Sequence, residues 1–596
     1  MGPIDRMRKR DVPLSRRIAT LTITALMLAA APAEGQIRLF PDLGSEPAPA
    51  QPAPASPQSQ SRPQTEGEAS APKGFRIEGL AAPEIDAVGL AGPAEGGFGE
   101  SLWAGSDGEL VLALLSNLPV ASENPPLTAL TRRLLMTGAP LRGVLEPGSV
   151  LAARADRLLA MGDLDGAAAL LERVPSTRSD SQIARLVVQT ALLRDDAAAA
   201  CGRAGDIAPT SEAAFWAKVA IYCRLVDGDR DGAMLGLDLL RDQGLSEDAA
   251  FFALATMVAQ GQPATVPLPP GGPTPLHVAM YRLADLPLPR AVLADASPEM
   301  LAVAAREPRL VADDPLAVAE RAFLFGALPA DDLAARYRER SSGDAQDLRN
   351  RIATAWDPDT RALAYDVLPG EQVSERGQLL DALWRRAQGY ERFLVARLFA
   401  QPYAELPVER GRLRVAPSLA RALLAAERPI PAARWFSLVS TDAGIDPLAG
   451  DDLAELTPLF ALAGFGGSVA VPVFDDRSMA GWLAGNEAAL AQLGPLLGLL
   501  EGIGLSVPAT AWQQLIVAPV PEAVPAPPAP LWGALAGAAT RRQVGETVLL
   551  ALHMMGGRPE AAHPQAVAAA LRGLRSVGLD QEARDIAIAT ALAMGM

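Results

Sequence analysis

A run of aspartates between residues 227 and 238 has the spacing of a calcium-binding loop. The loop would supply carboxylate oxygens at alternating positions, and these are the hard ligands that Ca²⁺ prefers. It would need residues 233–235 to be extended, whereas the apolar spacing around them is that of a helix start. Calcium binding is therefore one of two competing interpretations. The residues that match D-x-D-x-D-G with a carboxylate at position 12 are Asp227, Asp229, Asp231, Gly232 and Asp238.

Cys201 and Cys223 are the only cysteines in the sequence. An even pair of cysteines favours a disulfide bond if the chain is exported. Cys201 lies on the small-residue face of one expected helix, and Cys223 lies on the apolar face of the next. Because such helices touch in stacked hairpins, we predict a Cys201–Cys223 disulfide. The alternative is two free, buried thiols that pack as small hydrophobic groups.

Five Asp-Asp pairs are a further candidate for chemistry, because neighbouring carboxylates can perform acid–base hydrolysis. Each pair stands just before an apolar run, where helix caps and acids favoured by the helix dipole belong. We therefore predict that these pairs cap helices and do not catalyse a reaction. They begin at Asp195, Asp313, Asp331, Asp451 and Asp475.

The other catalytic and metal-binding patterns are missing from the sequence. His277, His553 and His563 are its only histidines, and none has a partner at metal-ligand spacing. There is no G-x-S-x-G nucleophile elbow and no Gly-Lys-Ser/Thr phosphate loop. The sequence therefore predicts no catalytic residue and no cofactor, while a histidine triad assembled from distant residues stays open.

The first 33 residues have the pattern of a signal peptide. A basic start precedes an apolar run at residues 18–31, which is too short to span a bilayer comfortably. Small residues then offer a cleavage position after Ala33, with Gly35 as the second choice. We therefore expect a periplasmic protein, attached to a membrane only if this leader is kept.

Composition limits the classes of partner and the number of packed units. The whole chain has a formal net charge of −16, and its leader is basic, so the remainder is more acidic still. A general nucleic-acid binder would need a basic face. Hydrophobic residues make up 49% of the sequence, which is enough for packed cores. A chain of 596 residues exceeds the size of one core, so we expect two to four packed units.

Apolar residues at helical spacing fill most of the chain after Ser106, and they predict an all-α fold. Two Pro-rich breaks, 263–275 and 518–530, are expected to be domain boundaries. The expected parts are a signal peptide (1–33), a Pro/Ala-rich disordered linker (34–74), an irregular Gly-rich segment (75–105), and helical units at 106–262, 276–517 and 531–596.

A short turn sequence recurs in the first helical unit. Gly-Asp-Leu-Asp-Gly-Ala at 162–167 returns as Gly-Asp-Arg-Asp-Gly-Ala at 228–233, and turns at 194 and 261 complete a spacing of 32 to 34 residues. The chain here resembles tetratricopeptide-type repeats, whose period is about 34 residues. The resemblance implies helical hairpins that stack into an array with a long groove, of the kind that binds peptides or proteins.

These observations predict a non-catalytic, exported helical scaffold that binds protein or peptide partners in the bacterial cell envelope. One alternative is an envelope enzyme on a helical superhelix, such as a peptidoglycan-cleaving lytic transglycosylase. Its catalytic domain would have to fit in residues 531–596, which are Ala-rich and few. A second alternative is a calcium-responsive binding module based on residues 227–238.

Overall fold

The computed structural model describes residues 84–143, 145–174, 181–205, 213–245, 247–263, 265–464, 472–485, 489–517 and 524–596. The expected signal peptide (1–33) and linker (34–74) lie outside these residues. Within them the chain is all-α, as predicted, with 29 α-helices, several short 3-10 turns and a single isolated bridge between Ala91 and Thr137. In this described part, every helix is too short or too polar to cross a membrane.

The helices before the first Pro-rich break are α1 (Gly108–Ser116), α2 (Pro125–Met136), α3 (Ser149–Ala160), α4 (Leu164–Glu172), α5 (Ser181–Leu193), α6 (Ala197–Gly205), α7 (Ala213–Val226), α8 (Arg230–Asp242) and α9 (Ala249–Gln260). Those between the two breaks are α10 (Pro275–Leu283), α11 (Arg290–Ala294), α12 (Pro298–Arg306), α13 (Pro315–Leu324), α14 (Ala330–Arg340), α15 (Ala345–Thr354), α16 (Pro358–Val367), α17 (Val373–Arg386), α18 (Glu391–Leu398), α19 (Ala400–Ala404), α20 (Ala416–Ala425), α21 (Pro429–Asp442), α22 (Pro447–Ala463), α23 (Asp476–Gly485), α24 (Ala489–Gly502) and α25 (Ala509–Val517). The last four are α26 (Ala529–Thr540), α27 (Val544–Met555), α28 (Pro564–Ser576) and α29 (Asp580–Ala593).

Three helical hairpins lie where the recurring turn sequence predicts them, as α3–α4, α5–α6 and α7–α8. A residue with left-handed backbone stands two positions after the end of each first helix, and an aspartate then caps the second helix by accepting an N–H bond three residues on. The left-handed residues are Gly162 (φ +85°), Asp195 (φ +61°) and Gly228 (φ +80°). The capping aspartates are Asp163, Asp196 and Asp229.

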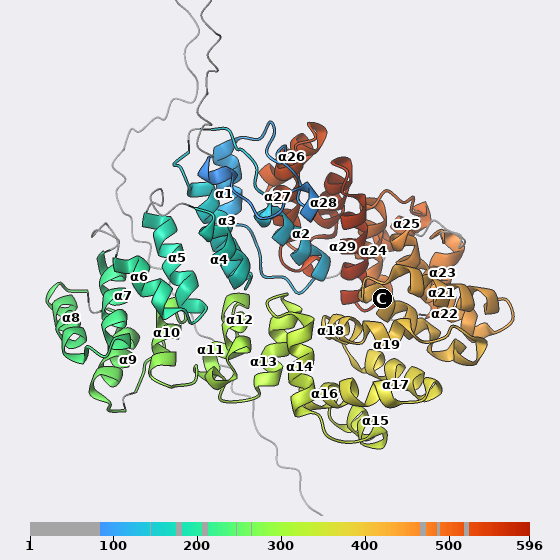
Figure 1. Ribbon diagram of the computed structural model, residues 1–596. Helices are drawn as coiled ribbons and strands as arrows, with labels where there is room; N and C mark the ends of the chain where they lie inside the picture. The colour runs from blue at the N-terminus through green and yellow to red at the C-terminus, as the bar shows by residue number, and fades with distance from the viewer. Residues whose placement is uncertain are drawn as a thin grey trace, which may run out of the picture. The chain divides into compact units, whose positions relative to one another are not determined.

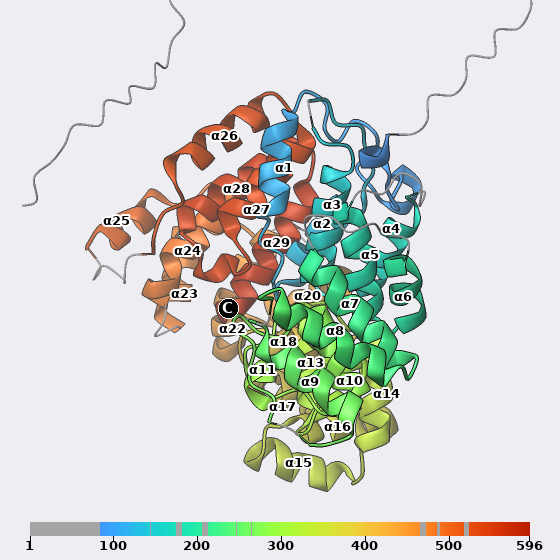
Figure 2. The same cartoon turned by 90° about the vertical axis from the view of Figure 1, so that its left-hand side faces the viewer.

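The first helices of the body pack against the last ones. Helix α2 contacts α29, and α1 contacts α27; Figures 1 and 2 show these blue and red helices side by side. An ion pair of 2.6 Å joins Arg133 Nη1 on α2 to Glu582 Oε1 on α29. Gly545 on α27 leaves room for the ring of Trp103, which would lie 2.4 Å from a Cβ there. Residues Leu80–Met596 therefore form one compact unit, and contacts cross both Pro-rich breaks.

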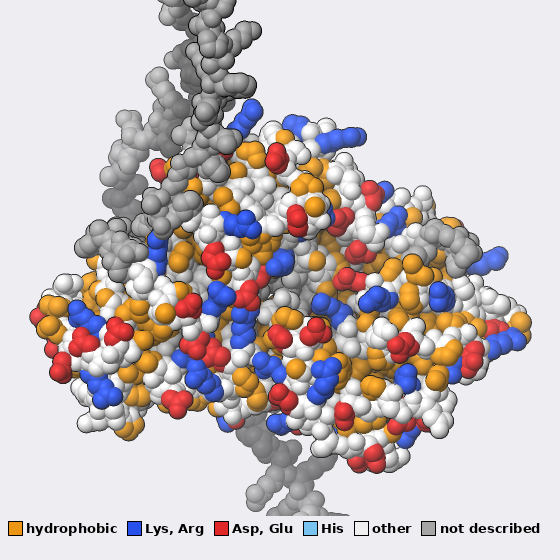
Figure 3. Space-filling view, viewed as in Figure 1, with side chains coloured by type: hydrophobic (Ala, Val, Ile, Leu, Met, Phe, Trp, Pro, Cys, Tyr) orange, Lys and Arg blue, Asp and Glu red, His pale blue; other side chains and the backbone are white. Residues whose placement is uncertain are grey.

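Charged side chains of both signs are interspersed over the face drawn in Figure 3. Blue guanidinium groups lie next to red carboxylates across the described helices, with hydrophobic side chains between them. This face therefore lacks the continuous basic surface that a nucleic-acid backbone requires.

Residues 84–105 contain short 3-10 turns but no α-helix, and buried polar contacts attach them to the body. Arg154 on α3 is only 1% exposed and donates to the carbonyls of Val88 and Leu135, at 2.6 and 2.8 Å. Burial lowers the pKa of Arg154 to about 10. Asp86 accepts bonds from the N–H groups of Gly148 and Leu151, so it caps α3 from outside the helix.

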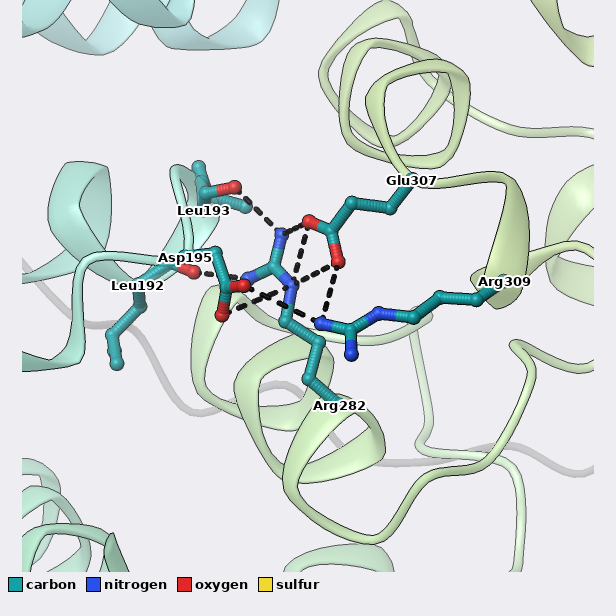
Figure 4. Close-up of polar contacts among 6 residues, drawn as sticks. All are labelled: Leu192, Leu193, Asp195, Arg282, Glu307 and Arg309. Atoms are coloured by element: carbon teal, nitrogen blue, oxygen red, sulfur yellow. Dashed lines mark hydrogen bonds and ion pairs between the residues drawn. The ribbon is translucent and has the colours of Figure 1, made fainter.

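Arg282 on α10 joins the helices on the two sides of the first Pro-rich break (Figure 4). Its side chain is only 4% exposed and donates to the carbonyls of Leu192 and Leu193, which end α5. The same guanidinium donates to Glu307 Oε1 at 2.8 Å. Arg309 bridges Glu307 and Asp195 from the exposed side. The guanidinium therefore satisfies the Leu193 carbonyl, and it adds to the long bond of 3.4 Å that the Leu192 carbonyl accepts from the Asp195 N–H.

Glu299 on α12 faces Asp156 and Arg157 of α3, and it should make stability depend on pH. Burial, and then the Asp156 charge, raise the pKa of Glu299 to about 7. Because this pKa is above the unfolded value, the folded chain holds the proton more tightly, and stability falls as pH rises from about 5 to about 8. Glu299→Gln should make the stability of the protein less dependent on pH over this range. It should raise the free energy of unfolding at pH 8 by about 1 kcal/mol.

Urea denaturation of both proteins at pH 5.5 and pH 8 measures this effect. Glu339→Gln, at an exposed position on α14, is the matched control and should change neither value. A Glu299→Gln protein whose stability falls with pH as steeply as the wild type does would contradict the assignment.

Candidate functional site

A cleft of about 250 Å³ lies where α4, α5 and α6 meet. Its walls come from two successive hairpins, so each hairpin supplies only part of it. The side chains that line it are mainly apolar, and charged groups stand among them. The apolar lining residues are Ala168, Leu171, Val174, Ile183, Val187, Ala191 and Ala199. The polar ones are Glu172, Thr190, Arg194, Asp196 and Arg203.

Polar groups at this cleft are held by partners of their own. Thr190 donates its hydroxyl to the Leu186 carbonyl at 2.7 Å. Arg194 Nε lies 3.1 Å from Asp165 Oδ1, so the two side chains form an ion pair. A hydrogen bond from Arg306 lowers the pKa of Asp165. Asp196 is occupied as the cap of α6. The cleft therefore offers apolar contact with fixed charges at its edge, which suits an apolar side chain of a partner.

The two cysteines lie on neighbouring helices, of which only α6 lines this cleft. Cys201 on α6 and Cys223 on α7 have their sulfur atoms 2.04 Å apart, which is a disulfide distance, and their Cα atoms 5.6 Å apart. The pair would fasten the second hairpin, whose helices line the cleft, to the third. The two cysteines that were predicted to pair therefore lie at disulfide distance.

The calcium-loop conformation is not formed at residues 227–238. Helix α8 begins at Arg230, so residues 233–235 are helical and not extended. Asp229 is the cap of α8, and Asp238 lies 2.7 Å from Arg241 on the same helix. In the described residues no group of three or more His, Cys, Asp and Glu side chains is arranged to hold a metal ion.

Most of the Asp-Asp pairs stand at helix starts, as predicted. Caps that accept an N–H bond three residues on come from Asp196 at α6, Asp314 at α13 and Asp475 at α23. Asp331 and Asp332 lie in the first turn of α14. The prediction is wrong for Asp451 and Asp452, because Asp446 caps α22 and places that pair in the second turn.

A polar cluster that the sequence analysis did not find surrounds Asp248, next to a cavity of about 410 Å³. Asp248 accepts from His277 Nε2 and from Lys218 Nζ, each at 2.8 Å. Thr274 donates its backbone N–H to His277 Nδ1 at 3.1 Å, which leaves the imidazole proton on Nε2. Burial opposes ionisation of Asp248, but hydrogen bonds from His277 and Lys218 outweigh it and hold the pKa of this carboxyl below its usual range.

The order Thr274, His277, Asp248 resembles a hydrolytic triad, since the threonine Oγ1 lies 2.8 Å from His277 Nδ1. The same atoms are occupied by helix starts, however. Thr274 and His277 form the capping box of α10, and Asp248 caps α9 by accepting from the Phe251 N–H. Because Nδ1 already accepts a backbone N–H, it is poorly placed to take a proton from the hydroxyl. The cluster fixes α7, α9 and α10 together.

No protein-family model, curated protein or solved structure was found to match this chain.

Proposed function

We propose that this chain is an exported, non-catalytic helical scaffold that binds a protein or peptide partner in the bacterial cell envelope. The observation that carries the proposal is the apolar cleft shared by the first two hairpins. In helical-repeat proteins, a groove between hairpins contacts an extended partner along its length. Because the charged groups at the edge of the cleft are already ion-paired, apolar contact would be the main attraction for the partner. The charges would then determine which part of the partner sits in the cleft.

The rival proposal is an envelope enzyme that cleaves peptidoglycan on a helical superhelix. The Thr274–His277–Asp248 cluster is the arrangement nearest to a catalytic one in the described residues, and its atoms serve as helix caps. Zymography on purified cell wall separates the two proposals. A clearing band from the purified chain, lost in His277→Gln, would favour the enzyme.

The cleft can be tested with two neighbouring substitutions on α6. Ala199 and Ala198 are both exposed, but only Ala199 lines the cleft. Ala199→Glu would place a carboxylate over the apolar lining, so it should reduce retention of the partner at least about 10-fold, equivalent to 1.4 kcal/mol. Ala198→Glu adds the same charge outside the cleft and should leave retention unchanged.

Retention is measured by cross-linking the purified chain to envelope extract and quantifying the captured protein by mass spectrometry. The proposal requires one envelope protein or peptide that both the wild type and Ala198→Glu retain and Ala199→Glu loses. Equal retention by the two variants would contradict a role for the cleft. The absence of any specifically retained partner would contradict the scaffold function itself.

A further inference from the structure

A third cavity, of about 390 Å³, lies between α17, α18, α20 and α22, near the place that the C label marks in Figure 1. This volume is within the range of roughly 300–1,000 Å³ that is usual for small-molecule sites. Side chains of both charges line it, together with Trp384, Pro417, Ser418 and the last two residues, Gly595 and Met596. It is separate from the cleft of the first two hairpins and does not depend on the proposed function.

Among the three arginines that line this cavity, one lacks an acidic partner within ion-pair distance. Arg421 is paired with Glu455 at 2.9 Å, and Arg385 is paired with Asp381 at 2.8 Å. Arg392 has no carboxylate within ion-pair distance in the described residues. Its Nε donates to the Ala387 carbonyl at 3.3 Å, and its guanidinium lies over the ring of Trp384. Burial and the nearby charge of Arg421 lower the pKa of Arg392, so an anion there would be stabilising.

One aspartate in the lining likewise lacks a basic partner within ion-pair distance. Asp452 lines the same cavity from α22, and the described chain gives its carboxylate neither an ion pair nor a hydrogen bond. Burial, and then the charge of Glu455, raise the pKa of Asp452, although the charges of Arg421, Arg414 and Arg385 act in the opposite direction. A cation at this position would relieve both effects. Arg392 and Asp452 are therefore unpaired charges of opposite sign that line one cavity without pairing with each other.

We infer that this cavity binds a small zwitterion, with its carboxylate on Arg392 and its ammonium on Asp452. A guanidinium presents parallel N–H groups that match a carboxylate, and this geometry favours Arg392 as the carboxylate-binding group. Glu455, which is paired with Arg421, is the other acid of α22 that lines the cavity. An anion without a cationic group would meet both carboxylates, and a cation without an anionic group would meet the arginines. Free amino acids and short peptides carry both groups on one small framework.

Isothermal titration calorimetry of the full chain at low salt tests the inference with the dipeptide Ala-Ala. The N-acetylated and C-amidated forms each lack one charge and should bind at least about 5-fold more weakly. Arg392→Gln keeps a donor for the Ala387 carbonyl, and Asp452→Asn keeps the side-chain volume. Each should weaken binding of the dipeptide by a similar factor. Arg386→Gln and Asp451→Asn, at neighbouring exposed positions that do not line the cavity, should leave it unchanged.

Three results would overturn the inference. The first is that Ala-Ala does not bind the wild type. The second is that a capped form, or acetate or inorganic phosphate, binds as tightly as the dipeptide, which would mean that only one charge is recognised. The third is that Arg392→Gln and Asp452→Asn bind the dipeptide as the wild type does while their melting curves show intact folding.

Discussion

Arg282→Met is expected to lower the free energy of unfolding by about 3–5 kcal/mol, the cost of breaking a buried ion pair by removing one partner. Methionine keeps much of the aliphatic volume but none of the hydrogen bonds. Glu307, which is only 17% exposed, would lose its main cation. The Leu193 carbonyl at the end of α5 would lose its donor and the Leu192 carbonyl would keep only a long bond from the Asp195 N–H, and unsatisfied buried groups add to the cost. Urea denaturation followed by circular dichroism measures the change.

Arg309→Met is the control for the same network. Arg309 contacts Glu307 and Asp195 as well, but its side chain is 56% exposed, so its loss should cost less than about 1 kcal/mol. If Arg282→Met were as mild as Arg309→Met, the buried guanidinium would not be what joins α5 to α10.

Cys223→Ser is expected to remove about 3 kcal/mol of stability from the hairpins on either side of the cross-link. The bond would close a loop of 22 residues, and the chain-entropy estimate for a loop of this size gives that magnitude. The serine hydroxyl would also lie in partly buried surroundings, where an unpaired polar group is unfavourable. Hydrogen exchange should accelerate in α5 to α8 and remain unchanged in α26 to α29, because hairpins couple mainly to their neighbours.

Reductant provides an independent version of this experiment. Wild-type protein treated with dithiothreitol should lose the same stability as Cys223→Ser, and Cys223→Ser should not respond to it. Stability of the wild type that does not change on reduction would show that the two sulfurs are not bonded in solution.

The sequence predicted the hairpins whose turns carry a local signal. Glycine at 162 and 228 indicates a left-handed position, and the aspartate after it indicates a helix cap. Both turns can therefore be predicted from residue types. The same left-handed geometry recurs at Glu427 (φ +57°) and Arg542 (φ +56°) between α20 and α21 and between α26 and α27. Neither residue type favours that conformation, so tertiary packing sets it and the sequence could not mark these turns.

Contacts between distant residues account for the rest of what the sequence missed. The packing of α2 on α29 and the Arg282 network join residues separated by tens to hundreds of positions, and no spacing rule reports them. The cluster of Lys218, Asp248 and His277 was missed for the same reason. Asp452 was misassigned because its Asp-Asp pair stands before an apolar run, while the actual cap, Asp446, lies one turn earlier.

Export is the claim on which the proposed function depends most, and the intact mass of the protein recovered from cells tests it. The protein is alkylated under denaturing, non-reducing conditions and then weighed. We predict the mass of a chain that begins after Ala33, or after Gly35, with no alkyl group on Cys201 or Cys223. A full-length chain that carries two alkyl groups would contradict both the export and the disulfide.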